Sequence, residues 1–311
     1  VAVGPYAADA LTTGGSNVVI GMHALGAAQT VDACVAVGYE ALSANTGGAY
    51  LTAVGYGALL QNTTGAGNVS LGFRARRYGT GQNYNTAIGH EAIQGANGYN
   101  SGADHNTAVG YNALKADNSG ANNTAIGSAA LVAVTTGNYN TAVGHAAGEA
   151  LTTGVSNTIV GQEAAENLEG DSNTCIGRHA MQTATTADNC TAVGKDSMHG
   201  NTLTGNSNVS VGTNGHVMTS AHSNLLLGND CGKVLTTGGN NQLIGHDAGR
   251  SNSPSGEITT GDNNVVLGNN NTANLYCADT SISSSDARDK TDIEDFTHGL
   301  SWIKELRPVT Y

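Results

Sequence analysis

The chain has 311 residues, of which 44 are Gly and only 3 are Pro, and its net charge is −12 from 24 acidic and 12 basic residues. Charged residues make up 12% and aromatic residues 5%, which is low for an ordinary globular protein and favours a narrow interior of small side chains. The acidic balance argues against binding to nucleic acid or to anionic lipid surfaces, and no apolar run is long enough to insert in a membrane.

A unit of about 17 residues recurs along most of the chain, marked by the string Asn-Thr-Ala-Val-Gly and its variants. The residue before the repeat glycine is always Val, Ile or Leu. Sixteen copies are indexed by Gly4, Gly21, Gly38, Gly55, Gly72, Gly89, Gly110, Gly127, Gly144, Gly161, Gly177, Gly194, Gly212, Gly228, Gly245 and Gly268. Asn stands four residues before this glycine in most copies, including Asn85, Asn106, Asn123, Asn140 and Asn157.

These repeat positions predict one flat coil of a β-solenoid. The alternation of Thr86, Ala87 and Ile88 is typical of a short β-strand, and such strands stack at about 4.8 Å. The glycine permits a positive φ or a close backbone approach at a corner, and the Asn row predicts side-chain hydrogen bonds from coil to coil. An Ala followed by Leu, Ile or Met is expected to form the wall opposite the Val or Ile row. We therefore expect an all-β roll or helix of about sixteen coils, each with two or three short strands.

Two spacings exceed the period by four residues or more, 21 residues before Gly110 and 23 before Gly268, and they predict loops near residues 97–105 and 250–262. The only basic cluster of the repeat region is Arg74, Arg76 and Arg77, which we interpret as an intersubunit or surface feature, with contact to a carbohydrate or anionic polysaccharide as the alternative.

Other residues that could carry chemistry favour structural interpretations. The five cysteines lack CxxC spacing and are expected to be small buried side chains. We expect neither a metal nor a cofactor. The pairs Glu163 with Glu166 and Glu169 with Asp171 are expected to be solvated, because nothing places them across a cleft.

The strings NTAIGHEAI and NTAVGYNAL resemble the head repeats of trimeric adhesins and repeats of long phage tail fibres. The resemblance covers residues 1 to about 270. It implies a left-handed parallel β-roll and a homotrimer, in which the Ala-rich wall would be buried against two partner copies. A self-contained monomeric solenoid is the alternative.

The composition changes after Asn274, where charged residues become dense. Leu300, Ile303 and Leu306 follow at the spacing of an amphipathic helix that Pro308 ends. The sequence thus predicts a repeat shaft over residues 1–274 and a different segment, partly α-helical, over residues 275–311.

The strings SSDARDKTDI and GLSWIKELRPVTY in this second segment resemble the start of the intramolecular chaperone of phage tail fibres and endosialidase-type tailspikes. That family assists trimer folding and then cuts itself free. The resemblance places its nucleophile on Ser285, its general base on Lys290 and the cut beside Ser285. Because the chain starts inside a repeat without Met and ends within this motif, we expect it to be a piece of a longer protein.

The expected function is that of a structural and adhesive fibre, a homotrimeric phage tail-fibre shaft in the virion. Its expected partners are further copies of itself, other virion tail proteins, and a glycan or protein receptor on the host surface. No enzymatic activity is expected of the shaft. The alternatives are a cell-surface trimeric adhesin or other extracellular filament, and a glycan depolymerase, which needs a carboxylate cluster in a groove. An ice-binding solenoid is the last alternative; it needs a regular Thr array, and we expect the Thr columns to be interrupted by Tyr, Asp and His.

Overall fold

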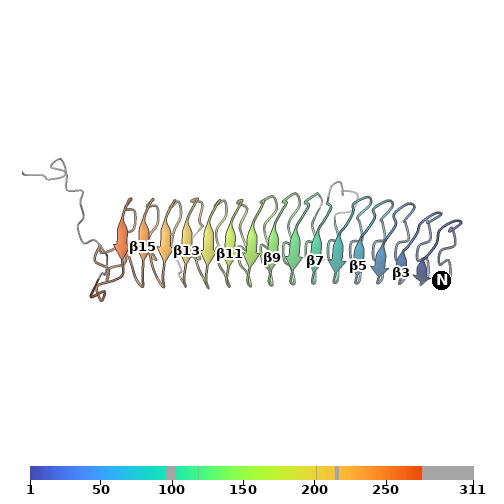
Figure 1. Ribbon diagram of the computed structural model, residues 1–311, viewed down its shortest axis with the longest axis horizontal. Coiled ribbons are helices and arrows are strands. Elements are labelled where there is room, and N and C mark those ends of the chain that lie inside the picture. The colour runs from blue at the N-terminus through green and yellow to red at the C-terminus, as the bar shows by residue number, and fades with distance from the viewer. Residues whose placement is uncertain (96–102, 118, 201, 214–216, 275–311) are drawn as a thin grey trace, which may run out of the picture. The chain divides into compact units, whose positions relative to one another are not determined.

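A computed structural model describes residues 1–95, 103–117, 119–200, 202–213 and 217–274 (Figure 1). The chain divides into two compact units, Val1–Asn271 and Thr272–Tyr311, and the first contains every strand described below. No helix occurs in the described residues, so none there could cross a membrane. The helix predicted around Leu300 to Leu306 lies outside the described residues.

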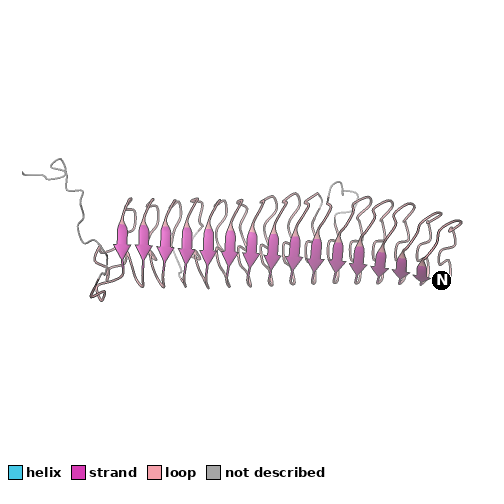
Figure 2. Cartoon of the chain, in the orientation of Figure 1, coloured by secondary structure: helices cyan, strands magenta, loops and turns pink. Residues whose placement is uncertain are grey.

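The first unit is a single parallel sheet of sixteen short strands that follow one another in chain order (Figure 2). The strands are β1 (Ala2–Val3), β2 (Val18–Ile20), β3 (Val35–Val37), β4 (Thr52–Val54), β5 (Val69–Leu71), β6 (Thr86–Ile88), β7 (Thr107–Val109), β8 (Thr124–Ile126), β9 (Thr141–Val143), β10 (Thr158–Val160), β11 (Thr174–Ile176), β12 (Thr191–Val193), β13 (Val209–Val211), β14 (Leu225–Leu227), β15 (Gln242–Ile244) and β16 (Val265–Leu267). The prediction of an all-β solenoid with coils of about 17 residues is confirmed.

Each coil contributes one strand, and the rest of the coil consists of turns and bends. The expectation of two or three strands per coil is therefore wrong. The reason is a repeated positive φ at non-glycine residues just after the corner, such as 56° at His23 and 51° at Leu25, which turns the backbone where an extended segment was expected.

The middle residue of each strand points into the coil, and the two flanking residues point outward. In β8 and β9, Ala125 and Ala142 are fully buried, whereas Ile126 is exposed. The Val, Ile or Leu before each glycine thus lies on the outer face and is not a wall of the core. The Ala rows are already buried within their own chain, so the expectation that an Ala-rich wall packs against partner copies is wrong.

The two long spacings do not interrupt the sheet. Thr86 pairs with Thr107 across the 21-residue interval, and Gln242 pairs with Val265 across the 23-residue interval. The register of the sheet therefore passes through both insertions. Residues 97–102 of the first predicted loop lie outside the described residues.

Candidate functional site

The repeat glycines form a column along one corner of the solenoid. Gly21, Gly38, Gly55, Gly72, Gly89, Gly110, Gly127, Gly144 and Gly161 have φ between 132° and 144°. A Cβ atom added at Gly110 would lie 2.4 Å from the carbonyl oxygen of Gly127 in the next coil. The backbone conformation and the close stacking both require glycine at this corner.

The Asn row, which we call the Asn ladder, lies inside the coil and links each coil to the next. Asn123 donates its backbone N–H to Asn106 Oδ1 at 2.8 Å and its side-chain Nδ2 to the Gly137 carbonyl at 2.8 Å. Asn140 in turn donates its backbone N–H to Asn123 Oδ1 at 2.9 Å. Because all three asparagines are fully buried, each amide satisfies backbone groups that water does not reach.

The ladder has gaps at Cys34, Leu51 and Cys190, and in each case an asparagine three residues from the unserved carbonyl bonds it within the same coil. Where Leu51 stands in the ladder, Asn62 Nδ2 donates to the Gly65 carbonyl at 3.0 Å. Where Cys34 stands in it, Asn45 donates to the Gly48 carbonyl at 2.9 Å. Where the ladder residue is not Asn, a side-chain hydrogen bond within one coil therefore takes the place of the side-chain hydrogen bond between two coils.

Arg76 occupies the interior position that leucine or isoleucine holds in neighbouring coils and is only 1% exposed. Its Nη2 lies 3.2 Å from Gln82 Oε1, while its Nε and Nη1 have no hydrogen-bond partner. Gln82, Asp117 and Arg76 line a small cavity with room for about one water molecule. The interpretation of the cluster Arg74, Arg76 and Arg77 as an intersubunit or surface feature is therefore wrong for Arg76.

Burial shifts both charged groups of this cavity toward their neutral forms. It lowers the pKa of Arg76 to about 10 and raises that of Asp117 to about 8. Asp117 Oδ1 accepts the Gly120 N–H and Oδ2 accepts Asn106 Nδ2, both at 2.9 Å, and these bonds partly offset the cost of burial. The carboxyl group thus serves the Asn ladder and does not directly contact the guanidinium.

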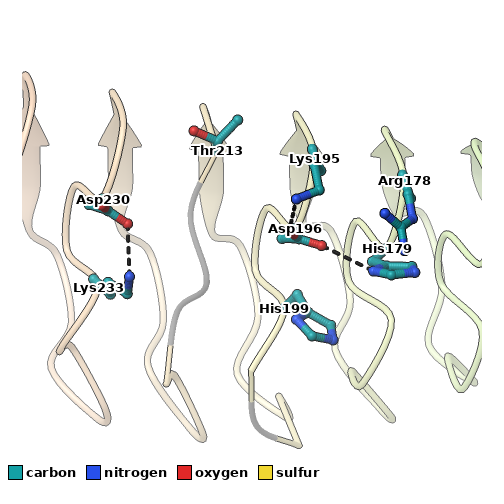
Figure 3. A pocket seen from close by; sticks show the side chains of 8 residues that line it. All are labelled: Arg178, His179, Lys195, Asp196, His199, Thr213, Asp230 and Lys233. Atoms are coloured by element: carbon teal, nitrogen blue, oxygen red, sulfur yellow. Dashed lines mark hydrogen bonds and ion pairs between the residues drawn. The ribbon is translucent and has the colours of Figure 1, made fainter.

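A charged surface cluster lies over consecutive coils near the C-terminal end of the solenoid (Figure 3). His179 Nε2 lies 3.0 Å from Glu163 Oε2, and its Nδ1 lies 3.1 Å from Asp196 Oδ1. Lys195 Nζ approaches the other oxygen of Asp196 at 3.0 Å. Arg178, Lys195 and Thr213 project from the coils beside this network, and Asp230 pairs separately with Lys233 (Figure 3). The arrangement is a partly exposed network of polar and charged side chains in which His179 lies between carboxylates of the neighbouring coils.

The carboxylates considered for glycan hydrolysis hold structural hydrogen bonds. Gln182 Nε2 donates to Glu166 at 2.5 Å and to Glu163 at 3.2 Å. Glu169 accepts the hydroxyl of Thr152 at 2.6 Å, and Asp171 accepts the N–H of Val155 at 2.7 Å. These contacts join neighbouring coils and do not set two carboxyl groups across a groove.

A column of stacked rings, which was not among the features expected from the sequence, follows the glycine corner in the N-terminal half. Tyr39, Tyr56, Phe73, His90 and Tyr111 stack with centroid separations of 5.0–5.3 Å. The signal in the sequence is an aromatic residue directly after five consecutive repeat glycines. Because the rings cover one another's faces, the column presents ring edges to solvent and no flat platform along which a sugar could stack.

The cysteines of the described region, Cys34, Cys175, Cys190 and Cys231, are free thiols and all are buried. Burial raises the pKa of Cys231 to about 12, so this thiol stays protonated and unreactive at neutral pH. Within the described residues no group of three or more His, Cys, Asp or Glu is placed to hold a metal ion.

The predicted dyad, Ser285 and Lys290, lies outside the described residues, so its geometry stays a prediction. A family model described as the chaperone of endosialidase matches residues 285–311. No curated protein and no solved structure shows significant similarity to the chain. The solenoid is thus known by its geometry alone, and the end of the chain is similar to an endosialidase chaperone, which in endosialidases cleaves itself.

Proposed function

We propose that the chain is the shaft of a homotrimeric phage tail fibre that attaches to the host surface. The observation that carries this proposal is the presence, in one chain, of a uniform β-solenoid and of a segment matching the endosialidase chaperone at residues 285–311. A chaperone of this type suits a chain that must align several copies of a long repeat before they fold.

The chaperone segment is proposed to release itself by acyl transfer. Ser285 Oγ attacks the carbonyl carbon of the adjacent scissile peptide bond, and Lys290, in its neutral form, accepts the hydroxyl proton. The proton then passes to the nitrogen that leaves, and water hydrolyses the ester that remains on Ser285. The chain supplies both groups, and the step needs no cofactor.

A gel assay of the full-length protein that carries this chain tests the cut. Wild type is expected to give two bands, and Ser285→Ala and Lys290→Ala one uncleaved band each. Ser284→Ala is the matched control, because it changes the neighbouring serine and should still be cleaved. An uncleaved wild type, or a cleaved Ser285→Ala variant, contradicts the assignment.

Attachment would be polyvalent, since three identical chains present each surface loop three times. Its proposed partners are a glycan or protein receptor on the host and other tail proteins of the virion. A cell-surface adhesin or extracellular filament is the rival, and it predicts a membrane anchor after the solenoid. If particles that lack the fibre no longer bind host cells, and adding purified fibre restores binding, the tail-fibre proposal is supported over the adhesin.

A further inference from the structure

The outer face of the sheet has a composition that does not suit a surface in contact with water. Each of the strands β2 to β16 points two side chains outward, and none of these side chains is Asp, Glu, Lys or Arg. Gln242 is the only amide, and the others are Val, Ile, Leu or Thr. All-parallel sheets occur almost only where both faces are covered, so a bare outer face is unusual.

The apolar residues of this face are substantially exposed in a single copy of the chain. Leu71 is 46% exposed, Ile126 41% and Leu267 44%. They come from β5, β8 and β16, and Ile20 of β2 is 42% exposed, so exposed apolar side chains occur from one end of the sheet to the other. A contiguous apolar surface of this length marks a site of association.

Charged residues gather just beyond the glycine corner that borders this face. The position two residues after the repeat glycine holds Glu40, Arg74, Glu91, Glu163 and Asp196. This position is also at the surface, so the chain does carry charged surface residues close to the sheet. Their absence from the outer face of the sheet is therefore specific to that face. Uncharged side chains at the centre, bordered by charged ones, are typical of a protein–protein interface.

The area of the face sets how much of the association it can carry. Fifteen strands at about 4.8 Å, with two outward residues per strand, give a strip about 70 Å long and about 10 Å wide, or roughly 700 Å² for each copy. Stable protein–protein interfaces bury about 800 Å² on each partner. Because each copy in a trimer meets two others, the strip forms the central part of both contacts, and the residues beside the corner, including the column of stacked rings, supply the remaining area.

We infer that the outward face of the sheet, formed by the residues on either side of the buried middle residue of β2–β16, is the surface on which copies of this chain associate side by side. The inference rests on the proposed homotrimeric fibre and names the surface that forms it. A cyclic trimer about an axis parallel to the solenoid sets the three sheets parallel, and every strand then meets the same strand of its partners.

The Thr residues of this face allow a second occupant to be considered. Thr86, Thr107, Thr124, Thr141, Thr158, Thr174 and Thr191 form an unbroken outward row on β6–β12, so the expectation that every Thr column is interrupted is wrong. Such a row could bind ice. The row ends at β12, whereas Val, Leu or Gln takes its place from β13 to β16, and the apolar face continues beyond it. Association of copies accounts for the whole face, and ice binding accounts only for its middle.

The test uses the full-length protein and measures its mass in solution by light scattering. Ile126→Asp with Val160→Asp places two charges on the face, two coils apart, so that they do not repel each other strongly. The matched control is Thr136→Asp with Thr186→Asp, which adds the same charge at exposed turns away from the sheet. Wild type and control should be trimers, and the face variant a monomer whose far-UV circular dichroism matches wild type.

A milder variant, Ile126→Thr with Val160→Thr, uses the residue already common on this face and should weaken the trimer at least tenfold without unfolding the coil. A trimeric face variant would overturn the placement of the interface and leave the fibre proposal intact. A monomeric wild type would overturn both. If that monomer also lowered the freezing point below the melting point, ice would be the occupant of the face.

Discussion

The carbonyl oxygen of Gly65 lies inside the solenoid at a place that the Asn ladder does not serve, because Leu51 stands in the ladder there. Asn62 Nδ2 reaches it instead at 3.0 Å. Further along the chain, in the coil of Asn140, the ladder residue is Asn and bonds Gly154 at 2.8 Å, while Leu151 occupies the place equivalent to Asn62. The two arrangements are alternative solutions to one hydrogen-bonding requirement.

Replacing Asn62 by Leu should therefore lower the free energy of unfolding of the wild-type chain, but should have little effect in a chain that also carries Leu51→Asn. The single variant leaves the buried Gly65 carbonyl unpaired, which costs about 1–3 kcal/mol, and the added apolar burial offsets only part of this. We expect a net loss of about 2 kcal/mol. Combining it with Leu51→Asn recreates the arrangement of Asn140 and Leu151, so the free energy of unfolding should return to within about 1 kcal/mol of wild type.

The measurement is a double-mutant cycle by denaturant titration, monitored by circular dichroism. The matched control pairs Leu51→Asn with Asn45→Leu, because Asn45 serves Gly48, and Cys34, not Leu51, is the ladder residue facing that carbonyl. Leu51→Asn should not rescue this variant. Equal rescue of both variants, or rescue of neither, would refute the idea that the two asparagine positions substitute for each other.

Three further changes test other features of the interior. Arg76→Leu should raise the free energy of unfolding by about 1–4 kcal/mol, because it removes a buried cation whose Nε and Nη1 have no hydrogen-bond partner; a less stable variant would show that the guanidinium has a favourable partner in solution. Asp117 has a pKa of about 8 in the fold against an ordinary 3.8, so the fold binds this proton more tightly, and stability should fall as pH rises from about 4 to about 8. Asp117→Asn should flatten that decline in thermal melts, and an unchanged slope would contradict the assignment. Gly127→Ala should cost more than about 3 kcal/mol or prevent folding, because its Cβ would collide with the Gly144 carbonyl, whereas Gly256→Ala, which meets nothing within 4 Å, should cost about 1 kcal/mol.

The sequence was sufficient for the fold class because one short pattern recurs at nearly constant spacing. The alternation at Thr86, Ala87 and Ile88 located β6, and the repeat glycines and asparagines stood where a corner and an interior ladder were expected. These features are local to one repeat, so a single copy carries them.

Which side of each strand faces inward could not be read from the same pattern. Hydrophobicity favours burial of Ile126 over Ala125, yet Ala125 is buried, because the leucine of the opposite wall, such as Leu131, fills the coil there. Where that wall carries Gly148, Gly232 or Gly249, the buried middle residue is large instead, as at Ile159, Leu226 and Leu243. Arg76 was misread for a related reason, since its neighbours in sequence are Arg74 and Arg77, whereas its neighbours in space are Leu59 and Ile93. The turns at His23 and Leu25 gave no signal, because their positive φ occurs without Gly.

The in-register pairing of Thr86 with Thr107 across a longer interval has a consequence for how such a chain can evolve. Length and decoration are separately heritable: duplicating one repeat lengthens the rod by about one strand spacing, while residues added at a corner leave its length unchanged. Mutations could therefore change a surface loop on one coil without moving the loops on other coils. Gain or loss of whole repeats could change the length of the solenoid without altering its loops.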